Sequence, residues 1–300
     1  EQLRTIAARL EYLRNLVARQ EAVLASIAEQ GKLTDDLRQR IESATVLQEV
    51  EDLYLPFRPK RRTRAMMARE KGLEPLAALI LAQEATRGTP EELAAAYLGT
   101  EVPTVEEALA GARDIVAEVV AEDADTRAAT RSGLLAQGVL KSARVADAAD
   151  ERGTYAVYYD YAERLAAIPP HRLLAIRRGE AEGVLRVSLE ADDEALTAAI
   201  GRRRVNERSV LAGQLEEAIA DGYARLLRPS LEREVQSGRL AEAEEHAIRV
   251  FGANLRGLLL QAPLRNVRVL GLDPGYRTGC KAAVVDATGK YLASETIYPH

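Results

Sequence analysis

Apolar residues recur every three or four positions through the first 28 residues of the chain, which predicts a long amphipathic helix. The stripe consists of Leu3, Ile6, Leu10, Leu13, Val17, Leu24 and Ile27, with the polar Gln20 in the same row. This spacing is typical of a heptad seam. Gly31 then favours a helix end, and Thr34 is a favourable N-cap for a second helix. The apolar side of that second helix carries Leu37, Ile41, Leu47 and Val50. Because the seam is short for a stable dimer, we expect an internal antiparallel hairpin, with an intermolecular zipper as the alternative.

Helical signals continue through the middle of the chain, with two places that are typical of strands. The sequence TPEE at residues 89–92 offers a capping threonine, a proline at the first helical position and a glutamate at the third. Apolar and polar residues alternate at 139–145 and at 184–190, which predicts short strands. Between residues 207 and 261 we expect three helical runs, with breaks at Pro229–Ser230 and at Ser237–Gly238.

The pattern changes at Asn266. VRVLGLDPG is a strand-like run that ends in a turn, and the following residues predict two further strands around a turn at Asp286. The chain opens at Glu1 within a helical pattern and stops at His300 within a strand-like one, so we expect a piece of a longer protein. The predicted fold class is mainly α: an elongated multi-helix scaffold with a small β element at its C-terminal end.

The composition indicates the kind of cellular compartment to expect for the protein. The chain has 300 residues, 47% of them hydrophobic, and no apolar run approaches the roughly 20 residues of a membrane span. No signal peptide opens it. A single cysteine, Cys280, excludes an internal disulfide and fits a reducing compartment. We therefore expect a cytoplasmic protein.

One short segment has a charge opposite to that of the chain. The formal net charge of the protein is -5, yet residues 56–71, the basic segment, hold seven basic residues and one acidic residue. Five of the basic residues crowd together: Arg58, Lys60, Arg61, Arg62 and Arg64. Pro56 and Pro59 keep the backbone extended between them. Such a density of positive charge favours an anion, and the phosphates of nucleic acid are the obvious one.

Two other interpretations of the basic segment stay open. Its side chains could pair with acidic residues of the same chain, such as Glu49, Glu51 and Asp52, or they could simply face water. A second basic cluster, GRRRVNER at residues 201–208, is expected at a helix junction, where solvated surface is its ordinary interpretation.

No cofactor or metal site is predicted. Asp273 follows a hydrophobic strand, which is a common way to present a carboxylate, but metal-dependent nuclease chemistry needs several converging carboxylates. Asp273 is therefore only a weak catalytic candidate, and Asp286 is a turn former. The chain has no HExxH or CxxC motif, so no catalytic residues are assigned and no enzyme is expected.

Four segments resemble the Tex family of bacterial transcription accessory proteins, in the order expected for that family. They are LYLPFRPKRRTRAMMAREKGLEPLA, IPPHRLLAIRRGEAEGVLRV, RPSLERE and VLGLDPGYRTGCKAAVVD. The resemblance implies an N-terminal helical, helix-turn-helix-like region over residues 1–55 and a central helical region over 56–263. Residues 266–300 would be the first strands of a YqgF domain, which has a ribonuclease-H-like fold. The family's helix-hairpin-helix modules and its RNA-binding OB-fold would lie outside this chain.

The same resemblance implies a function, and two alternative functions stay open. It implies a nucleic-acid-binding transcription accessory protein that contacts the phosphate backbone of RNA or DNA and works with the transcription machinery. The residues expected to make that contact are Arg58, Lys60, Arg61, Arg62 and Arg64. The alternatives are a protein-interaction platform for transcription partners and part of a metal-dependent nuclease.

Overall fold

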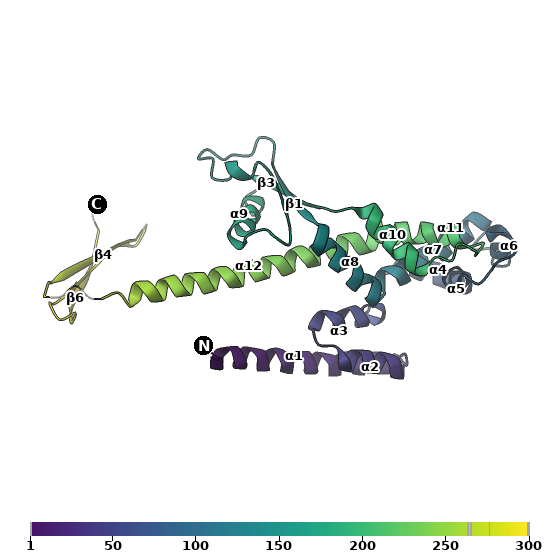
Figure 1. Cartoon of the computed structure of the whole chain (residues 1–300), viewed down its shortest axis with the longest axis horizontal. Helices are drawn as coiled ribbons and strands as arrows, with labels where there is room; N and C mark the ends of the chain where they lie inside the picture. The colour runs from purple at the N-terminus through teal and green to yellow at the C-terminus, as the bar shows by residue number, and fades with distance from the viewer. Residues whose placement is uncertain (1, 263, 265, 276, 299–300) are drawn as a thin grey trace. The chain divides into compact units, whose positions relative to one another are not determined.

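The computed structural model describes residues 2–262, 264, 266–275 and 277–298 (Figure 1). The chain forms two compact units, Glu1–Ala243 and Glu244–His300, and helix α12 (Arg228–Leu259) contributes residues to both. None of the helices in the described ranges combines the length and the apolar character that a membrane span requires.

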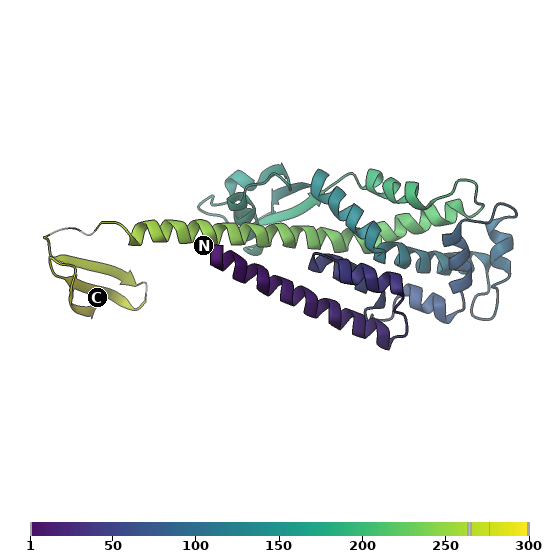
Figure 2. The ribbon, with the colours of Figure 1, turned by 60° about the horizontal axis from the view of Figure 1, so that its bottom comes forward.

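The first unit begins with helices α1 (Gln2–Glu29), α2 (Asp35–Ser43) and α3 (Leu47–Tyr54). Gly31 has a φ of 67°, in the left-handed region, and Thr34 caps α2, so both predicted signals are confirmed. The predicted second helix is instead two helices, because the backbone turns extended at Ala44 and Val46. Figure 2 shows α2 and α3 beside the C-terminal half of α1.

The predicted seam along α1 is half right. Its buried residues are Leu16, Gln20, Val23 and Ile27, whereas the first five residues of the predicted stripe are exposed. The reason is length, because α2 and α3 together are shorter than α1 and cover only one end of it.

Gln20, the polar break in the stripe, has a structural role. Its amide nitrogen lies 2.8 Å from the carbonyl oxygen of Ile41 and 3.1 Å from that of Ala44. These carbonyls lie at the end of α2, where a helix leaves such groups without internal partners. A buried polar side chain therefore terminates α2 instead of weakening the hairpin.

The rest of the first unit is a helical body. Its helices are α4 (Arg64–Glu70), α5 (Glu74–Ala82), α6 (Pro90–Ala95), α7 (Val105–Glu122), α8 (Ala124–Gln137), α10 (Asp193–Arg204), α11 (Ala212–Gly222) and the N-terminal part of α12. Helix α7 lies at its centre and contacts α4, α5, α6 and α11. The capping box predicted at Thr89 is confirmed at the start of α6.

Small residues let α7 and α11 approach closely. A Cβ atom on Gly222 would lie 2.8 Å from the carbonyl oxygen of Ala117, which is closer than van der Waals contact permits. The chain continues from α11 through a π-helical turn, η3 (Tyr223–Leu227), into α12. The predicted breaks at Pro229 and Gly238 are therefore wrong. Pro229 comes just after the π-helical turn, where the regular hydrogen-bond ladder of the helix is already interrupted, and one glycine costs a helix only about 1 kcal/mol.

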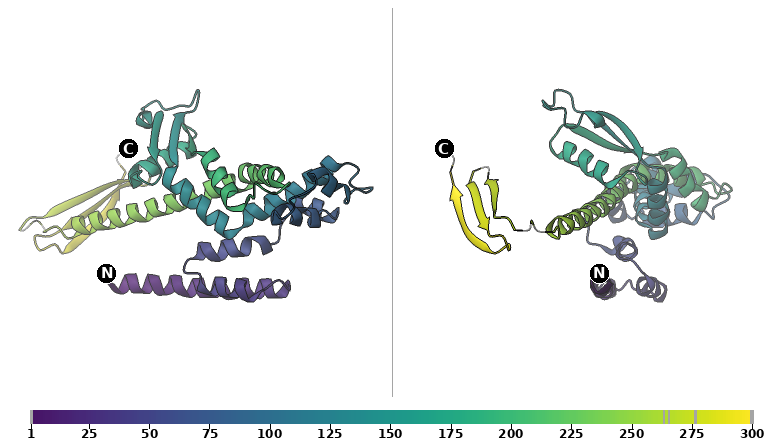
Figure 3. Two further views of the ribbon diagram at one scale, coloured as in Figure 1. Left: turned by 45° about the vertical axis from the view of Figure 1, so that its right-hand side comes forward. Right: turned by 60° about the vertical axis from the view of Figure 1, so that its left-hand side comes forward.

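A small antiparallel sheet is inserted between α8 and α10. Its order is β2-β1-β3, with β1 (Val139–Arg144), β2 (Asp160–Arg164) and β3 (Leu185–Glu190). The predicted strands at 139–145 and 184–190 are confirmed. Helix α9 (Pro170–Ala181) packs against β3 (Figure 3). Gly179 allows the side chain of Leu185 to lie close to the backbone of this helix.

The second unit contains an antiparallel sheet of order β4-β5-β6, with β4 (Val269–Gly275), β5 (Gly279–Val285) and β6 (Tyr291–Ile297). Asp286 forms the β5–β6 turn as predicted, and it accepts hydrogen bonds from the backbone nitrogens of Thr288 and Lys290. The mainly α fold class with C-terminal strands is thus confirmed. The boundaries at 55/56 and 263/266 stay predictions, and residues 263 and 265 lie outside the described residues.

Candidate nucleic-acid interface

The basic segment begins as an irregular connection after α3 and ends with α4, which forms its second half. After a 3-10 turn, η1 (Leu55–Phe57), the backbone runs irregularly from residue 58 to 63. The hydroxyl of Thr63 then caps α4 by accepting a hydrogen bond from the backbone nitrogen of Met66, at 3.0 Å. The local sequence therefore gives a short connector with a fixed beginning and end.

Lys60 faces the body of the protein. Its Nζ atom lies 2.5 Å from Oε2 of Glu122 and 3.5 Å from Oε1 of Glu118, both on α7. Arg69, further along the basic segment, lies 2.8 Å from the same Glu118. Part of the positive charge of the segment is thus neutralised by helix α7.

The internal partners are not the acidic residues that the sequence suggested. Glu49 accepts a hydrogen bond from the backbone nitrogen of Thr45, and Glu51 pairs with Arg19. Asp52 is buried and forms ion pairs with arginines of α8. Glu118 and Glu122 could have been recognised, since their i,i+4 spacing places both on one face of α7.

The remaining arginines of the segment point to solvent. Arg58, Arg61 and Arg64 are exposed and make no side-chain hydrogen bond or ion pair with any described residue. Arg62 pairs with Glu70 at 2.7 Å, but both side chains are more than half exposed. A pair of this kind is worth roughly 0–1 kcal/mol, so a phosphate could replace Glu70 at little cost. The segment therefore has an inner, neutralised side and an outer side without firm internal partners.

Arg64 differs from Arg58 and Arg61 in one respect. Its charge acts on Asp114 of α7, where it opposes the burial that raises the pKa of that carboxyl group. Arg58 and Arg61 are therefore the clearer candidates for contact with a ligand.

Glu118 gives the inner side a pH dependence. Burial would raise its pKa, but hydrogen bonds from Arg69 and Thr63 and the charge of Lys60 lower the pKa below its ordinary value. A lowered pKa adds stability above the unfolded value of 4.5 and loses it as the pH falls through the folded value. We expect Glu118→Gln to be less stable than wild type at pH 7, and the difference to shrink below pH 4.5.

Urea unfolding of both proteins across this pH range measures that difference. Burial raises the pKa of the neighbouring Glu122, and the charge of Glu118 adds to that rise, so Glu118→Gln also relieves part of it and the measured difference is the net of the two effects. A difference in stability that did not change with pH would contradict the assigned role of Glu118.

A second, deeper set of ion pairs ties α3 to the helical body. Arg127 on α8 contacts Asp52 at 2.7 Å and Glu234 on α12 at 3.1 Å. Arg131, one turn later, contacts Asp52 at 2.6 Å and also pairs with Glu234. Burial would lower the pKa of Arg131, but hydrogen bonds to Glu234 and Asp52 raise it. No local pattern pointed to this network, because its members come from helices that are far apart in the sequence.

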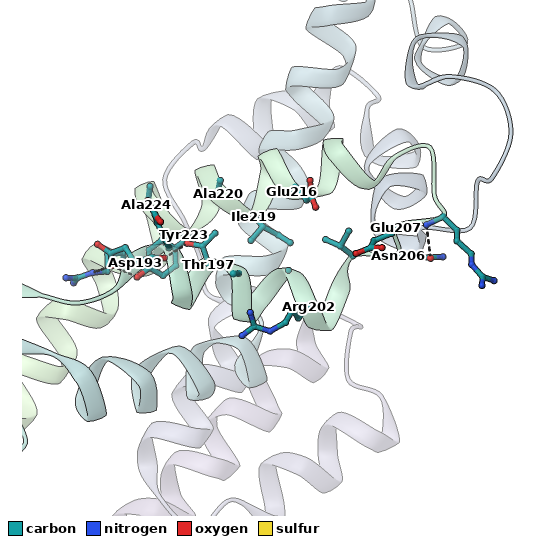
Figure 4. Close-up of a pocket in the computed structure, with 16 residues that line it drawn as sticks. Asp193, Thr197, Arg202, Asn206, Glu207, Glu216, Ile219, Ala220, Tyr223 and Ala224 are labelled. Carbon is teal, nitrogen blue, oxygen red and sulfur yellow. Dashed lines mark hydrogen bonds and ion pairs between the residues drawn. The ribbon is translucent and has the colours of Figure 1, made fainter.

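A groove of about 1150 Å³ lies in the first unit between α10 and α11 with η3. Figure 4 shows Thr197 and Arg202 on α10 and Ile219 and Ala220 on the facing helix. At one end the hydroxyl of Tyr223 donates to Asp193, and burial followed by this hydrogen bond raises the pKa of Tyr223. The lining mixes apolar side chains with charges of both signs.

Asp273 lies exposed on β4, opposite Lys281 in the strand register. Within the part of the chain that the structure describes, no three His, Cys, Asp or Glu side chains gather so that they could hold a metal ion. The histidines and Cys280 likewise form no shared site among those residues.

Comparison with known proteins identifies relatives of the whole chain. Protein tex of Bordetella pertussis is 47% identical over 99% of this chain and 39% of its own length. The transcriptional accessory protein Tex of Neisseria gonorrhoeae is 41% identical over 100% and 40%. The human S1 RNA-binding domain-containing protein 1 is 28% identical over 100% and 31%. The chain thus spans about two fifths of the length of its bacterial relatives.

Two family descriptions also match the sequence. "Tex protein YqgF-like domain" matches residues 267–300, which include β4, β5 and β6. "Tex central region-like" matches residues 85–251, which begin before α6 and end within α12. Because that match alone covers more than half of the sequence, the chain belongs to the Tex family.

Proposed function

We propose that this chain belongs to a cytoplasmic transcription accessory protein and that it contacts the phosphate backbone of nucleic acid without catalysing a reaction. The observation that carries the proposal is the outer side of the basic segment. Arg58, Arg61 and Arg64 stay exposed, without an ion-pair partner among the described residues, in a protein of net charge -5. Their neighbour Lys60 points inward to Glu122. The basic side chain that stabilises the fold is therefore a different one from those available to a ligand.

The comparisons support the same proposal. One relative carries the name of a transcriptional accessory protein, and another is named for an S1 RNA-binding domain. Arginine suits this contact because its planar guanidinium can donate two hydrogen bonds to one phosphate. Contacts of this kind fix position and give affinity without reading sequence.

Charge reversal of Arg58 and Arg61 tests the proposal. The slope of log affinity against log salt concentration is negative, and each lost phosphate contact should reduce its magnitude by about 1, because fewer counterions are released on binding. We therefore expect Arg58→Glu/Arg61→Glu to bind nucleic acid more weakly, with a slope whose magnitude is about two smaller than that of wild type. Fluorescence anisotropy at several salt concentrations measures the slope.

The matched control reverses two other exposed arginines, Arg152 and Arg186, which also make no side-chain ion pair with described residues. If the position of the arginines matters and not only the total charge of the protein, the slope of this control should equal that of wild type. An unchanged slope in Arg58→Glu/Arg61→Glu, or an equal loss in the control, would overturn the phosphate contact.

A further inference from the structure

The second basic cluster repeats the arrangement of the first. At the C-terminal end of α10, Arg204 turns inward, and its Nη2 atom lies 2.6 Å from Oδ2 of Asp123 and 3.0 Å from the hydroxyl oxygen of Thr126. Its neighbours Arg202 and Arg203 are exposed and make no side-chain ion pair with a described residue. As in the first cluster, one basic side chain forms an internal ion pair while its neighbours are exposed to solvent.

The two clusters converge on the same point of the fold. Lys60 is held by Glu122, the last residue of α7, and Arg204 is held by Asp123, the next residue and the N-cap of α8. Burial opposes ionisation of Asp123, but hydrogen bonds from Thr126 and the charge of Arg204 lower its pKa. Two segments that are far apart in the sequence are thereby fixed on consecutive residues of one helix junction.

The acidic residues of this junction are already occupied. Glu118 and Glu122 face Lys60 and Asp123 faces Arg204, whereas Asp125 is 75% exposed and forms only a surface pair with Arg40, at 2.7 Å. These internal pairs neutralise the acidic residues that would otherwise cancel the exposed arginines. The arginines of both segments are left facing solvent, with Glu207 as an exposed carboxylate within the second cluster.

We propose that Arg58 and Arg61 from one segment and Arg202 and Arg203 from the other form a single junction surface that binds the backbone of one nucleic-acid duplex. This inference rests on the proposed function and extends it, because it adds a second binding element and names the form of nucleic acid. The junction surface is defined by these four arginines.

The choice of a duplex follows from the aromatic residues. Proteins that hold single strands place exposed aromatic side chains beside the basic groove, so that unpaired bases stack on them. In the described part of the first unit, every Tyr and Phe is buried or half-buried, including Tyr54 and Phe57 next to the basic segment. A surface of guanidinium groups without stacking partners fits the outside of a duplex, where the phosphates are the accessible groups.

Arg202 and Arg203 also lie in the last turn of α10, where a positive charge favours the helix dipole. A purely structural role of this kind would lower the melting temperature on their removal and leave the salt slope unchanged. Neutral glutamine variants separate the two roles, since they avoid placing a negative charge at the helix end.

The experiment titrates the 300-residue chain with a duplex of about 20 base pairs and with a single strand of the same length, at several salt concentrations. We expect one duplex per chain and tighter binding of the duplex. Arg202→Gln/Arg203→Gln should reduce the magnitude of the negative salt slope by about two, and its combination with Arg58→Gln/Arg61→Gln by about four. Arg152→Gln/Arg186→Gln, the control, should behave as wild type.

The outcomes distinguish the two proposals. If only the Arg58 and Arg61 variants change the slope, the junction surface is refuted while the proposed function stands. If neither pair changes it, or if the chain binds no nucleic acid, both proposals fail. Tighter binding of the single strand, or two duplexes per chain, would also overturn the junction surface.

Discussion

Asp52→Asn is expected to destabilise the protein by about 3–5 kcal/mol, because it removes one partner of a buried set of ion pairs. The side chain of Asp52 is 5% exposed and that of Arg127 is 6% exposed. Without the carboxylate of Asp52, two guanidinium groups would share the single carboxylate of Glu234. The amide of asparagine keeps the shape of the side chain, so the loss would reflect charge and not a cavity.

The position of Asp52 makes this loss important for the N-terminal helices. The apolar cluster of α1, α2 and α3 has one described neighbour from α8, the half-buried Ala124. The attachment of α3 to the helical body therefore depends on charge more than on apolar packing. Urea unfolding at pH 7 measures the loss. Glu51→Gln is the matched control, since Glu51 is partly exposed and its pair with Arg19 should contribute less than about 1 kcal/mol.

An equal loss in the two variants, or a loss below about 1 kcal/mol for Asp52→Asn, would show that apolar contacts hold α3 in place. The Asp52 network also changes the interpretation of the basic segment. The sequence left open that its arginines pair with acidic residues of the same chain, Asp52 among them. The structure gives that role to Arg127 and Arg131, which leaves Arg58 and Arg61 without a structural partner among the described residues.

Local signals in the sequence predicted helix caps and turns, whereas the helix breaks predicted at Pro229 and Gly238 were wrong. The caps at Thr34 and Thr89, the stop at Gly31 and the turn at Asp286 are confirmed, because each depends on residues within a few positions. The register of the α1 seam was only partly predicted. A heptad pattern indicates which side of a helix is apolar, but the length of its partners decides how much of that side is covered.

Distant contacts could not be predicted from the sequence. Glu122 and Asp123 are adjacent in the chain, yet Glu122 pairs with Lys60, well before it in the sequence, and Asp123 pairs with Arg204, well after it. No periodicity or motif connects such residues, and an acidic run at the end of a helix is ordinarily solvated. The same limit explains why the cluster at 201–208 was interpreted as solvated surface: its relation to the basic segment exists only in the folded chain.

Leu140→Ala is expected to destabilise the protein by about 2–5 kcal/mol, because it removes a large, fully buried side chain where the surroundings cannot collapse. Leu140 lies on β1 opposite Leu189 of β3 and is 0% exposed. It belongs to the same apolar cluster as Leu134 of α8 and the buried residues of α7 and α11. The small sheet is therefore part of the core of the helical body, and we expect the sheet and the helical body to unfold in one transition in both proteins.

Urea unfolding followed by circular dichroism measures the free energy and the number of transitions. Val157→Ala is the control, because Val157 belongs to the same inserted region but is 74% exposed, and it should change stability by no more than about 0.5 kcal/mol. A separate early transition in Leu140→Ala would mean that the sheet folds independently of the helices. In that case the connection from β3 into α10 would not hold Arg202 and Arg203 rigidly beside the basic segment, and the junction surface would have to form on binding.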